Sequence, residues 1–285
     1  MKSLYIAILA LVLSTQVNAA VNQFDDAFMA DSFINEVPYT SVETLSNGTQ
    51  MQLPVKWWNA QSLWLWGTAD LQKTNDILKS MGLSAFDVNG KAMVGICANN
   101  YGGGTLGTFA GFFTLVLVND KNGGGPGVAF WHYYSSYKPN NMFKTQVWGI
   151  PTNLGVVETN FLGSHKGFRA KANANEIIEV QLASKDVDAL PYEHVPRKAL
   201  GKVISGNLFR ETNFPYESQF DGARLEKKAD GTYDTVIPFD AKKGDVLKYG
   251  DANNKFVQDM KTVSFVPTNW EYNKNVSGVV HVTKR

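Results

Sequence analysis

The feature that most constrains the fold is a series of short apolar runs separated by turn-rich pieces. The runs are rich in β-branched and aromatic residues, which favour strands. The pieces between them contain Gly, Asn, Asp and Pro, which are typical of turns. Many short strands with regular turns indicate a mostly β fold, either a barrel or a sandwich. The runs are Leu63–Trp66, Lys91–Ala98, Phe109–Val118, Val128–Tyr134, Thr145–Ile150, Gly155–Phe161, Phe168–Ala172 and Glu176–Leu182.

One segment has the period of a helix. Its apolar face consists of Leu71, Thr74, Leu78 and Met81. Thr68 or Asp70 can cap its first turn, and Gly82 can end it with a backbone conformation that other residues resist. The spacing therefore predicts one helix between the first two strands.

The chain of 285 residues is long enough for one large β domain. Its formal charge of +1 argues against nucleic acid as the main partner. No linker rich in Pro, Gly or Ser divides it, so we expect a single domain over residues 55–285. Residues 20–54 are polar and predict an irregular N-terminal arm. A homo-oligomer is possible, but no interface is legible in the sequence.

The first 19 residues have the pattern of a secretory signal peptide. Lys2 supplies a positive start, Leu4–Leu13 the apolar core, and Val17–Ala19 a cleavage site of small residues. The apolar run is too short to span a bilayer, and no later run is long enough. We therefore expect a secreted or periplasmic protein, cleaved near Ala19, with no membrane span.

Cofactor and metal motifs are weak. Cys97 is the only cysteine, which excludes an intrachain disulfide, and its apolar surroundings predict a buried thiol. The four histidines lack the spacing of metal ligands, and no Gly-Lys-Ser/Thr follows the glycine runs. We expect neither a metal nor a cofactor.

The segment Lys144–Gly155, with the sequence Lys-Thr-Gln-Val-Trp-Gly-Ile-Pro-Thr-Asn-Leu-Gly, resembles the signature of the acetoacetate decarboxylase family. That signature runs from Gly-Arg-Glu to Pro-Lys-Lys-Leu-Gly. Pro151, Leu154 and Gly155 match it. The order of predicted strands and helix over residues 55–185 is also similar. The resemblance implies an antiparallel β-barrel with an interior pocket.

The residues that carry the family's chemistry do not match. The first signature lysine forms a Schiff base with a keto acid, and acetoacetate decarboxylase is a standard example of a lysine activated in this way. Thr152 and Asn153 replace the two lysines, and neither side chain can form an imine. Gly95 and Gly111 align with the family's pocket carboxylates. The resemblance thus implies the scaffold without the Schiff-base reaction.

Three other lysines are near enough in sequence to take over the lost role. They are Lys144, Lys166 and Lys171. We expect all three to face solvent, because lysines are seldom fully buried.

His132 and Glu158 are the acid–base pair that the sequence offers. Strand alternation puts His132 on one face with Phe130 and Tyr134, and Trp131 with Tyr133 on the other. Either member could instead have a structural role, His132 in an aromatic core and Glu158 in a surface salt bridge.

We expect a protein that binds or transforms a small carbonyl-bearing or apolar molecule without Schiff-base catalysis. If it is an enzyme, a lyase-like activity is expected. The alternatives are a non-catalytic binding or structural barrel, and a decarboxylase or lyase with a relocated lysine. The predicted pocket residues are Thr152, Asn153, Trp148, Gln146, Asn99 and Tyr101.

Overall fold

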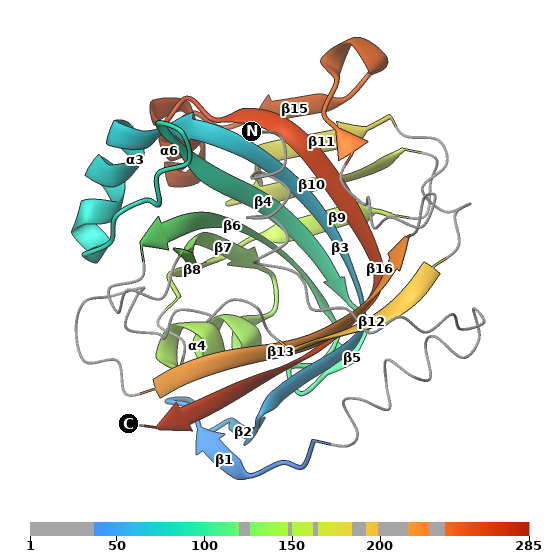
Figure 1. Ribbon diagram of the computed structural model, residues 1–285. Coiled ribbons are helices and arrows are strands. Elements are labelled where there is room, and N and C mark those ends of the chain that lie inside the picture. Colours follow the sequence, from blue (N-terminus) through green and yellow to red (C-terminus); the bar gives the residue numbers. More distant parts are fainter. Residues whose placement is uncertain are drawn as a thin grey trace.

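The computed structural model describes residues 37–119, 126–147, 150–161, 165–183, 192–198, 216–227 and 237–284 (Figure 1). The predicted signal peptide and Trp148 lie outside these ranges. Strands dominate the described chain, and nearly all of them pair antiparallel, as the sequence predicted.

A ten-stranded sheet forms the body of the molecule, with the order β12-β13-β16-β3-β4-β6-β7-β8, β14 pairing with β16 and β5 with β3. The long strands β3 and β16 curve through the whole fold side by side (Figure 1). Only the β7–β8 pair is parallel among the described strands. The bounds are β3 Val55–Asp70, β4 Lys91–Tyr101, β5 Gly103–Gly104, β6 Phe109–Asn119, β7 Pro126–Ser135, β8 Thr152–Leu154, β12 Tyr192–Lys198, β13 Tyr216–Lys227, β14 Ile237–Pro238 and β16 Val266–Lys284.

A four-stranded sheet packs against one face of this body. Its order is β15-β11-β10-β9, with bounds β9 Val156–Asn160, β10 Lys166–Ala172, β11 Asn175–Leu182 and β15 Val246–Tyr249. Helix α6, Lys255–Thr262, covers the same face. Phe112 on β6 joins the layers, with its ring centroid 5.7 Å from that of Phe168 on β10 and 4.9 Å from that of Phe256 on α6. We call this side of the large sheet the α6 face.

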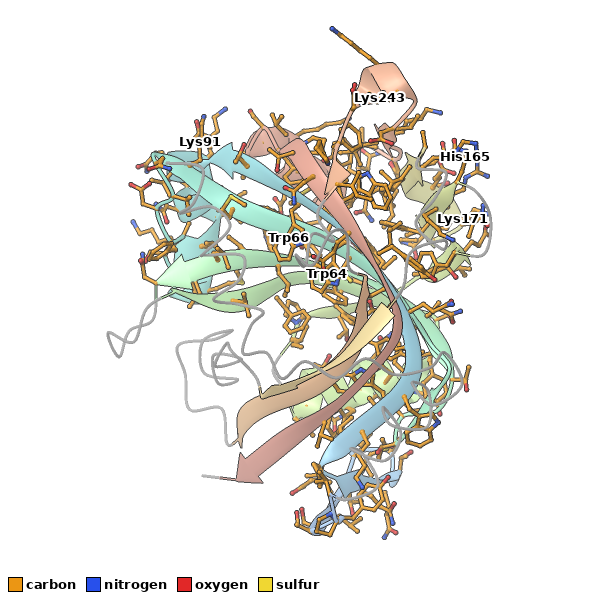
Figure 2. The ribbon with its side chains drawn as sticks, turned by 45° about the vertical axis from the view of Figure 1, so that its right-hand side comes forward. Trp64, Trp66, Lys91, His165, Lys171 and Lys243 are labelled. Atoms are coloured by element: carbon orange, nitrogen blue, oxygen red, sulfur yellow. The ribbon has the colours of Figure 1, made fainter. Side chains whose placement is uncertain are left out.

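The opposite side, which we call the α4 face, carries helix α4, Lys138–Gln146. Aromatic rings cover this face of the central strands. Trp64 and Trp66 stack with centroids 5.0 Å apart (Figure 2). The Phe113 ring lies edge-on to Trp64. The run Leu63–Trp66 is therefore embedded between two layers, and only Trp64 of the four is more than slightly exposed.

The predicted helix is confirmed. It comprises α3, Leu71–Leu78, and a 3-10 turn, η1, over Lys79–Met81. The Asp70 carboxylate accepts a hydrogen bond from the Lys73 N–H, and Gly82 ends the segment with a φ of 65°. Cap and terminator thus act as the sequence predicted.

The predicted strand Thr145–Ile150 was wrong. Residues 138–146 form α4, with a proline in its first turn, where a missing N–H costs nothing. The helix buries Phe143 completely, and this tertiary burial outweighs the strand propensity of the residues that follow.

Part of the predicted arm is also regular. Ser41–Thr44 (β1) and Gln50–Leu53 (β2) form a hairpin that buries Met51 and Leu53. The arm is thus folded rather than irregular in this stretch.

Candidate functional site

A bulge in β7 decides which side chains meet. His132 pairs with Thr114 and Phe130 with Leu115, so Trp131 is an extra residue on β7. Trp131 therefore lies on the α6 face with His132, while Phe130 contacts Phe113 on the other face. The predicted alternation was wrong at these two residues, because the bulge shifts the register by one.

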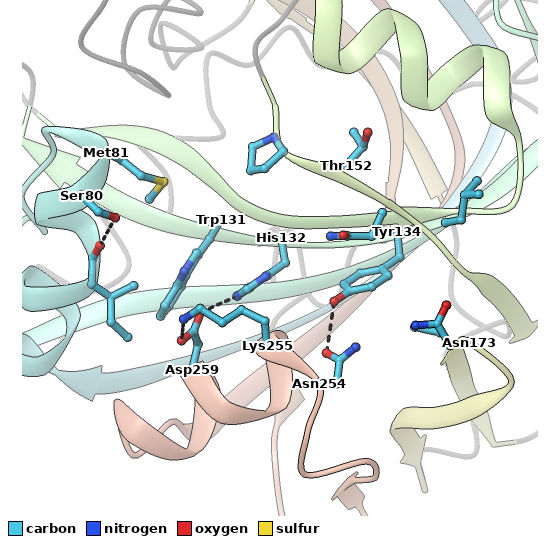
Figure 3. Close-up of a pocket in the computed structure, with 15 residues that line it drawn as sticks. Ser80, Met81, Trp131, His132, Tyr134, Thr152, Asn173, Asn254, Lys255 and Asp259 are labelled. Atoms are coloured by element: carbon cyan, nitrogen blue, oxygen red, sulfur yellow. Dashed lines mark hydrogen bonds and ion pairs between the residues drawn. The ribbon is translucent and has the colours of Figure 1, made fainter.

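A cleft of about 580 Å³ opens at this bulge on the α6 face (Figure 3). It lies where η1, the β7–β8 edge, the β10–β11 turn and the start of α6 meet. Such a volume suits a small organic ligand. Its lining residues are Ile77, Ser80, Met81, Trp131, His132, Tyr134, Pro151, Thr152, Asn153, Leu154, Ala172, Asn173, Asn254, Lys255 and Asp259.

A histidine and an aspartate form the chemical centre of the cleft. The His132 Nε2 atom lies 3.2 Å from the Asp259 Oδ2 atom, and both side chains are almost fully buried. The contact is within hydrogen-bonding distance, but its direction is poor for a hydrogen bond. Lys255 pairs with the other oxygen of the same carboxylate from an exposed position. One carboxylate thus serves two nitrogen groups.

Burial sets the charge of this cluster. It lowers the pKa of His132 below its ordinary value, and although Asp259 opposes the effect, the ring remains neutral at pH 7. Burial alone would raise the pKa of Asp259, but His132 and Lys255 outweigh it and lower that pKa. At neutral pH the centre therefore contains a neutral ring beside a carboxylate–ammonium pair.

Hydrogen bonds hold the surrounding side chains in place. The Tyr134 hydroxyl donates to Asn254 Oδ1 over 3.1 Å, and the same oxygen caps α6 by accepting from the Phe256 N–H. The Thr152 hydroxyl lies 2.7 Å from that of Thr145 and donates to the Asn141 carbonyl. Thr152 therefore lines the cleft while its hydroxyl is directed toward α4.

The α4 face carries a second buried ionisable group. Lys144 is 4% exposed, and its Nζ atom lies 4.6 Å from the centroid of the Tyr133 ring. Burial lowers the pKa of this ammonium to about 7. Asn140, one helical turn earlier, donates to the Tyr133 hydroxyl over 3.0 Å.

Aromatic side chains fill the space that carboxylates would need on this face. A Cβ atom at Gly95 would lie 2.6 Å from the Trp66 ring, and one at Gly111 would lie 2.8 Å from the Tyr133 hydroxyl. Neither position has room for a larger side chain unless these rings move.

The predicted site residues separate into groups. His132, Thr152 and Asn153 line the cleft together. Gln146 instead exchanges hydrogen bonds with Ser46 in the β1–β2 turn. Asn99 and Tyr101 bond to each other on β4, away from the cleft.

The pairing of His132 with Glu158 was wrong. Glu158 is on β9 and pairs with Lys171 at 2.9 Å on the exposed side of the second sheet. The carboxylate beside His132 is Asp259, which sequence reasoning missed. The apolar spacing of Phe256, Val257 and Met260 after the potential cap Asn254 is the signal that could have revealed its helix.

Two of the three lysine predictions were wrong. Besides Lys144, Lys166 is buried, and its Nζ atom donates to the Phe161 carbonyl over 2.6 Å. The Tyr272 ring lies beside it, so a carbonyl and an aromatic face replace water around the charge. Lys171 faces solvent as expected (Figure 2).

Neither a metal cluster nor a membrane helix is found within the described ranges. No three His, Cys, Asp or Glu side chains gather there to hold a metal ion. Of the helices described, none has the length and apolarity needed to cross a membrane. Cys97 is buried, and burial raises the pKa of its thiol, as suits an inert side chain.

The chain is similar to several solved structures. An acetoacetate decarboxylase from Legionella pneumophila aligns over 93% of this chain and 97% of its own, with 11% identity and a TM-score of 0.53. An acetoacetate decarboxylase-like enzyme from Sphingomonas wittichii RW1 aligns over 81% and 93%, with 11% identity and a TM-score of 0.49. The enduracididine biosynthesis enzyme MppR, complexed with pyruvate, aligns over 80% and 88%, with 12% identity and a TM-score of 0.46.

No protein-family model and no curated protein sequence matches the chain. The alignment with the Legionella pneumophila structure shows that the chain has the acetoacetate-decarboxylase-like fold that its sequence predicted. Because the two sequences are only 11% identical, the similarity extends to the fold alone.

Proposed function

We propose that this acetoacetate-decarboxylase-like fold binds a small carbonyl-bearing molecule in the α6-face cleft, where His132 exchanges a proton with it. The observation that carries the proposal is the His132–Asp259 pair at the wall of a ligand-sized cleft that Thr152 also lines. No imine is needed for this chemistry.

The neutral ring makes His132 a base. Nε2 faces Asp259, so Nδ1 is the nitrogen that would accept a proton from carbon next to the ligand's carbonyl. The imidazolium that forms is stabilised by the Asp259 carboxylate. Asn254 lines the same cleft, and its Nδ2 group offers N–H donors to the enolate oxygen that develops. Return of the proton to carbon or oxygen completes the exchange.

A second candidate function uses Lys144. Its pKa of about 7 leaves a large fraction of the amine unprotonated at neutral pH, which is the state that attacks a carbonyl. This is the relocated-lysine alternative. It would operate on the α4 face, on the opposite side of β7 from His132.

Deuterium exchange distinguishes the two candidates. The wild-type protein is incubated with 2-hexanone in D₂O, and loss of the protons next to the carbonyl is followed by NMR. We expect exchange that falls at least tenfold in His132→Gln and persists in Lys144→Met, since a general base contributes about a hundredfold or more.

Borohydride trapping provides the complementary test. A covalent adduct with 2-hexanone in the wild type, absent from Lys144→Met, would establish the imine route. Exchange that survives His132→Gln would remove the leading proposal.

We also propose that the protein is exported, on the strength of the N-terminal signal pattern alone. Expression of the full chain in a secreting host, followed by N-terminal sequencing, should give a mature protein that begins at Ala20. A chain that retains Met1 in the cell would contradict this.

A further inference from the structure

The cleft has two chemically different ends. Met81 and Trp131 lie at one end and present apolar surface there (Figure 3). The hydroxyl of Ser80 beside them already donates to the Ile77 carbonyl. Asn173 and Asn254 lie at the other end with Tyr134, and His132 is between the two ends (Figure 3). A ligand that fills the cleft therefore meets apolar groups at one end and amides at the other.

The amide end offers hydrogen-bond donors. The Asn254 Oδ1 atom already accepts from Tyr134 and from the Phe256 N–H, which leaves its Nδ2 group to interact with a ligand. Asn173 is fixed in the β10–β11 turn with a φ of 51°. An uncharged carbonyl or hydroxyl group is a good partner for such amides.

The charges of the cleft balance. Lys255 is paired with Asp259, and His132 is neutral at pH 7. A bound carboxylate would meet no spare positive side chain among the cleft residues, and it would lose its hydration on entry. The start of α6 is the one feature that favours an anion, through its helix dipole.

We infer that the cleft selects an uncharged, elongated molecule whose apolar tail lies at Met81 and Trp131 and whose hydrogen-bonding head lies at Asn173 and Asn254. This ligand class rests on the proposed function, because it assigns the cleft as the binding site. It excludes a small carboxylate as the preferred ligand.

Three probe molecules distinguish the effect of the ligand's apolar tail from the effect of a charge on its head group. Butanamide and hexanamide differ by two methylene groups, and hexanoate replaces the amide of hexanamide by a carboxylate. Binding to the full chain is measured at pH 7 by NMR titration. We expect hexanamide to bind about tenfold more tightly than butanamide, the effect of burying two methylene groups. Hexanoate should bind at least tenfold more weakly than hexanamide.

Two variants locate the ends. Met81→Ser should reduce the advantage of hexanamide over butanamide to about threefold or less, because it removes apolar surface at the tail end. Asn173→Gly keeps a residue that accepts positive φ and should weaken both amides about equally. Asn89→Gly is the matched control, because Asn89 has a φ of 54° in a turn outside the cleft. It should leave all affinities unchanged.

Each other outcome has a definite meaning. Equal affinities for the two amides, tighter binding of hexanoate, or no binding of any probe at millimolar concentration would overturn the ligand class. If His132-dependent exchange of 2-hexanone persists in such a case, the proposed function still stands. If the amides bind as expected but exchange is absent, the proposed function fails and the ligand class holds.

Discussion

The two faces of β7 give a buried ionisable group different surroundings, as His132 and Lys144 show. On the α6 face His132 has a carboxylate within 3.2 Å and lies at the wall of a cleft. On the α4 face Lys144 is packed over the Tyr133 ring, in a layer of aromatic side chains. The residues His132 and Tyr133 are adjacent in sequence, yet they belong to opposite layers.

The difference shows that burial alone lowers a pKa but does not by itself provide a proton-transfer site. Burial lowers the pKa of both groups. At His132 the Asp259 carboxylate opposes the effect of burial and can stabilise the protonated ring, which a proton-transfer group requires. A lowered pKa is therefore found on both faces, whereas the ligand-sized cleft and the Asp259 carboxylate favour the α6 face as the place of the proposed proton transfer.

The largest effect should come from Lys144. Its folded-state pKa of about 7 lies below the ordinary 10.5, so the unfolded chain binds more protons between these values, and stability rises with pH across that window. The free energy of unfolding should increase by roughly 4 kcal/mol from pH 7 to pH 10.

Lys144→Met should remove that slope, because no buried amine then titrates between these pH values. Urea unfolding at pH 7, 8.5 and 10 measures both chains, and Lys171→Met serves as the exposed control. Equal slopes in the wild type and Lys144→Met would show that Lys144 is hydrated.

The aromatic side chains that fill the α4 face predict the next largest change in stability. Gly95→Ala should destabilise the fold by about 2 kcal/mol, because its Cβ would lie 2.6 Å from the stacked Trp66 ring. The cost should shrink when Trp66 is replaced by Leu, which a double-mutant cycle in urea measures. An unchanged unfolding midpoint in Gly95→Ala would mean that this face has spare room.

The His132–Asp259 pair predicts opposite shifts in two variants. Asp259→Asn should lower the pKa of His132 further and cost about 1.5 kcal/mol of stability, because the ring loses its charged partner. Lys255→Met should raise the pKa of His132, because a nearby positive charge is removed. NMR titration of the ring protons reads both, and shifts in the same direction would contradict the shared-carboxylate arrangement.

The smallest effect should come from Gln146. Gln146→Ala removes two exposed hydrogen bonds to Ser46 and should cost less than about 1 kcal/mol. Hexanamide affinity should not change, because Gln146 lies outside the cleft. A tenfold loss of affinity would restore Gln146 as a binding residue.

The sequence predicted the strands and α3 well because their patterns are local. Each predicted run between Leu63 and Leu182 has the strand-forming residues that short-range propensity recognises, and each lies largely in a strand except Thr145–Ile150. Helix α4 escaped prediction because its stability comes from the burial of Phe143 and not from its own propensities.

The site was predicted in part for a similar reason. His132 and Thr152 lie near each other in sequence and meet across β7 and β8. Asp259 is 127 positions after His132 and joins it only through the packing of α6 onto the sheet. The exposed side chain expected at Lys144 follows a general tendency of lysines, which the packing of α4 overrides.

The cleft depends on the extra residue in β7, Trp131, which is both the bulge and part of the cleft wall. Deleting the codon for Trp131 would restore regular pairing with β6 and remove the aromatic wall in the same event. A conservative replacement at this position would change only the wall. A gap of one residue here in a homologue would therefore predict a cleft of different shape and lining.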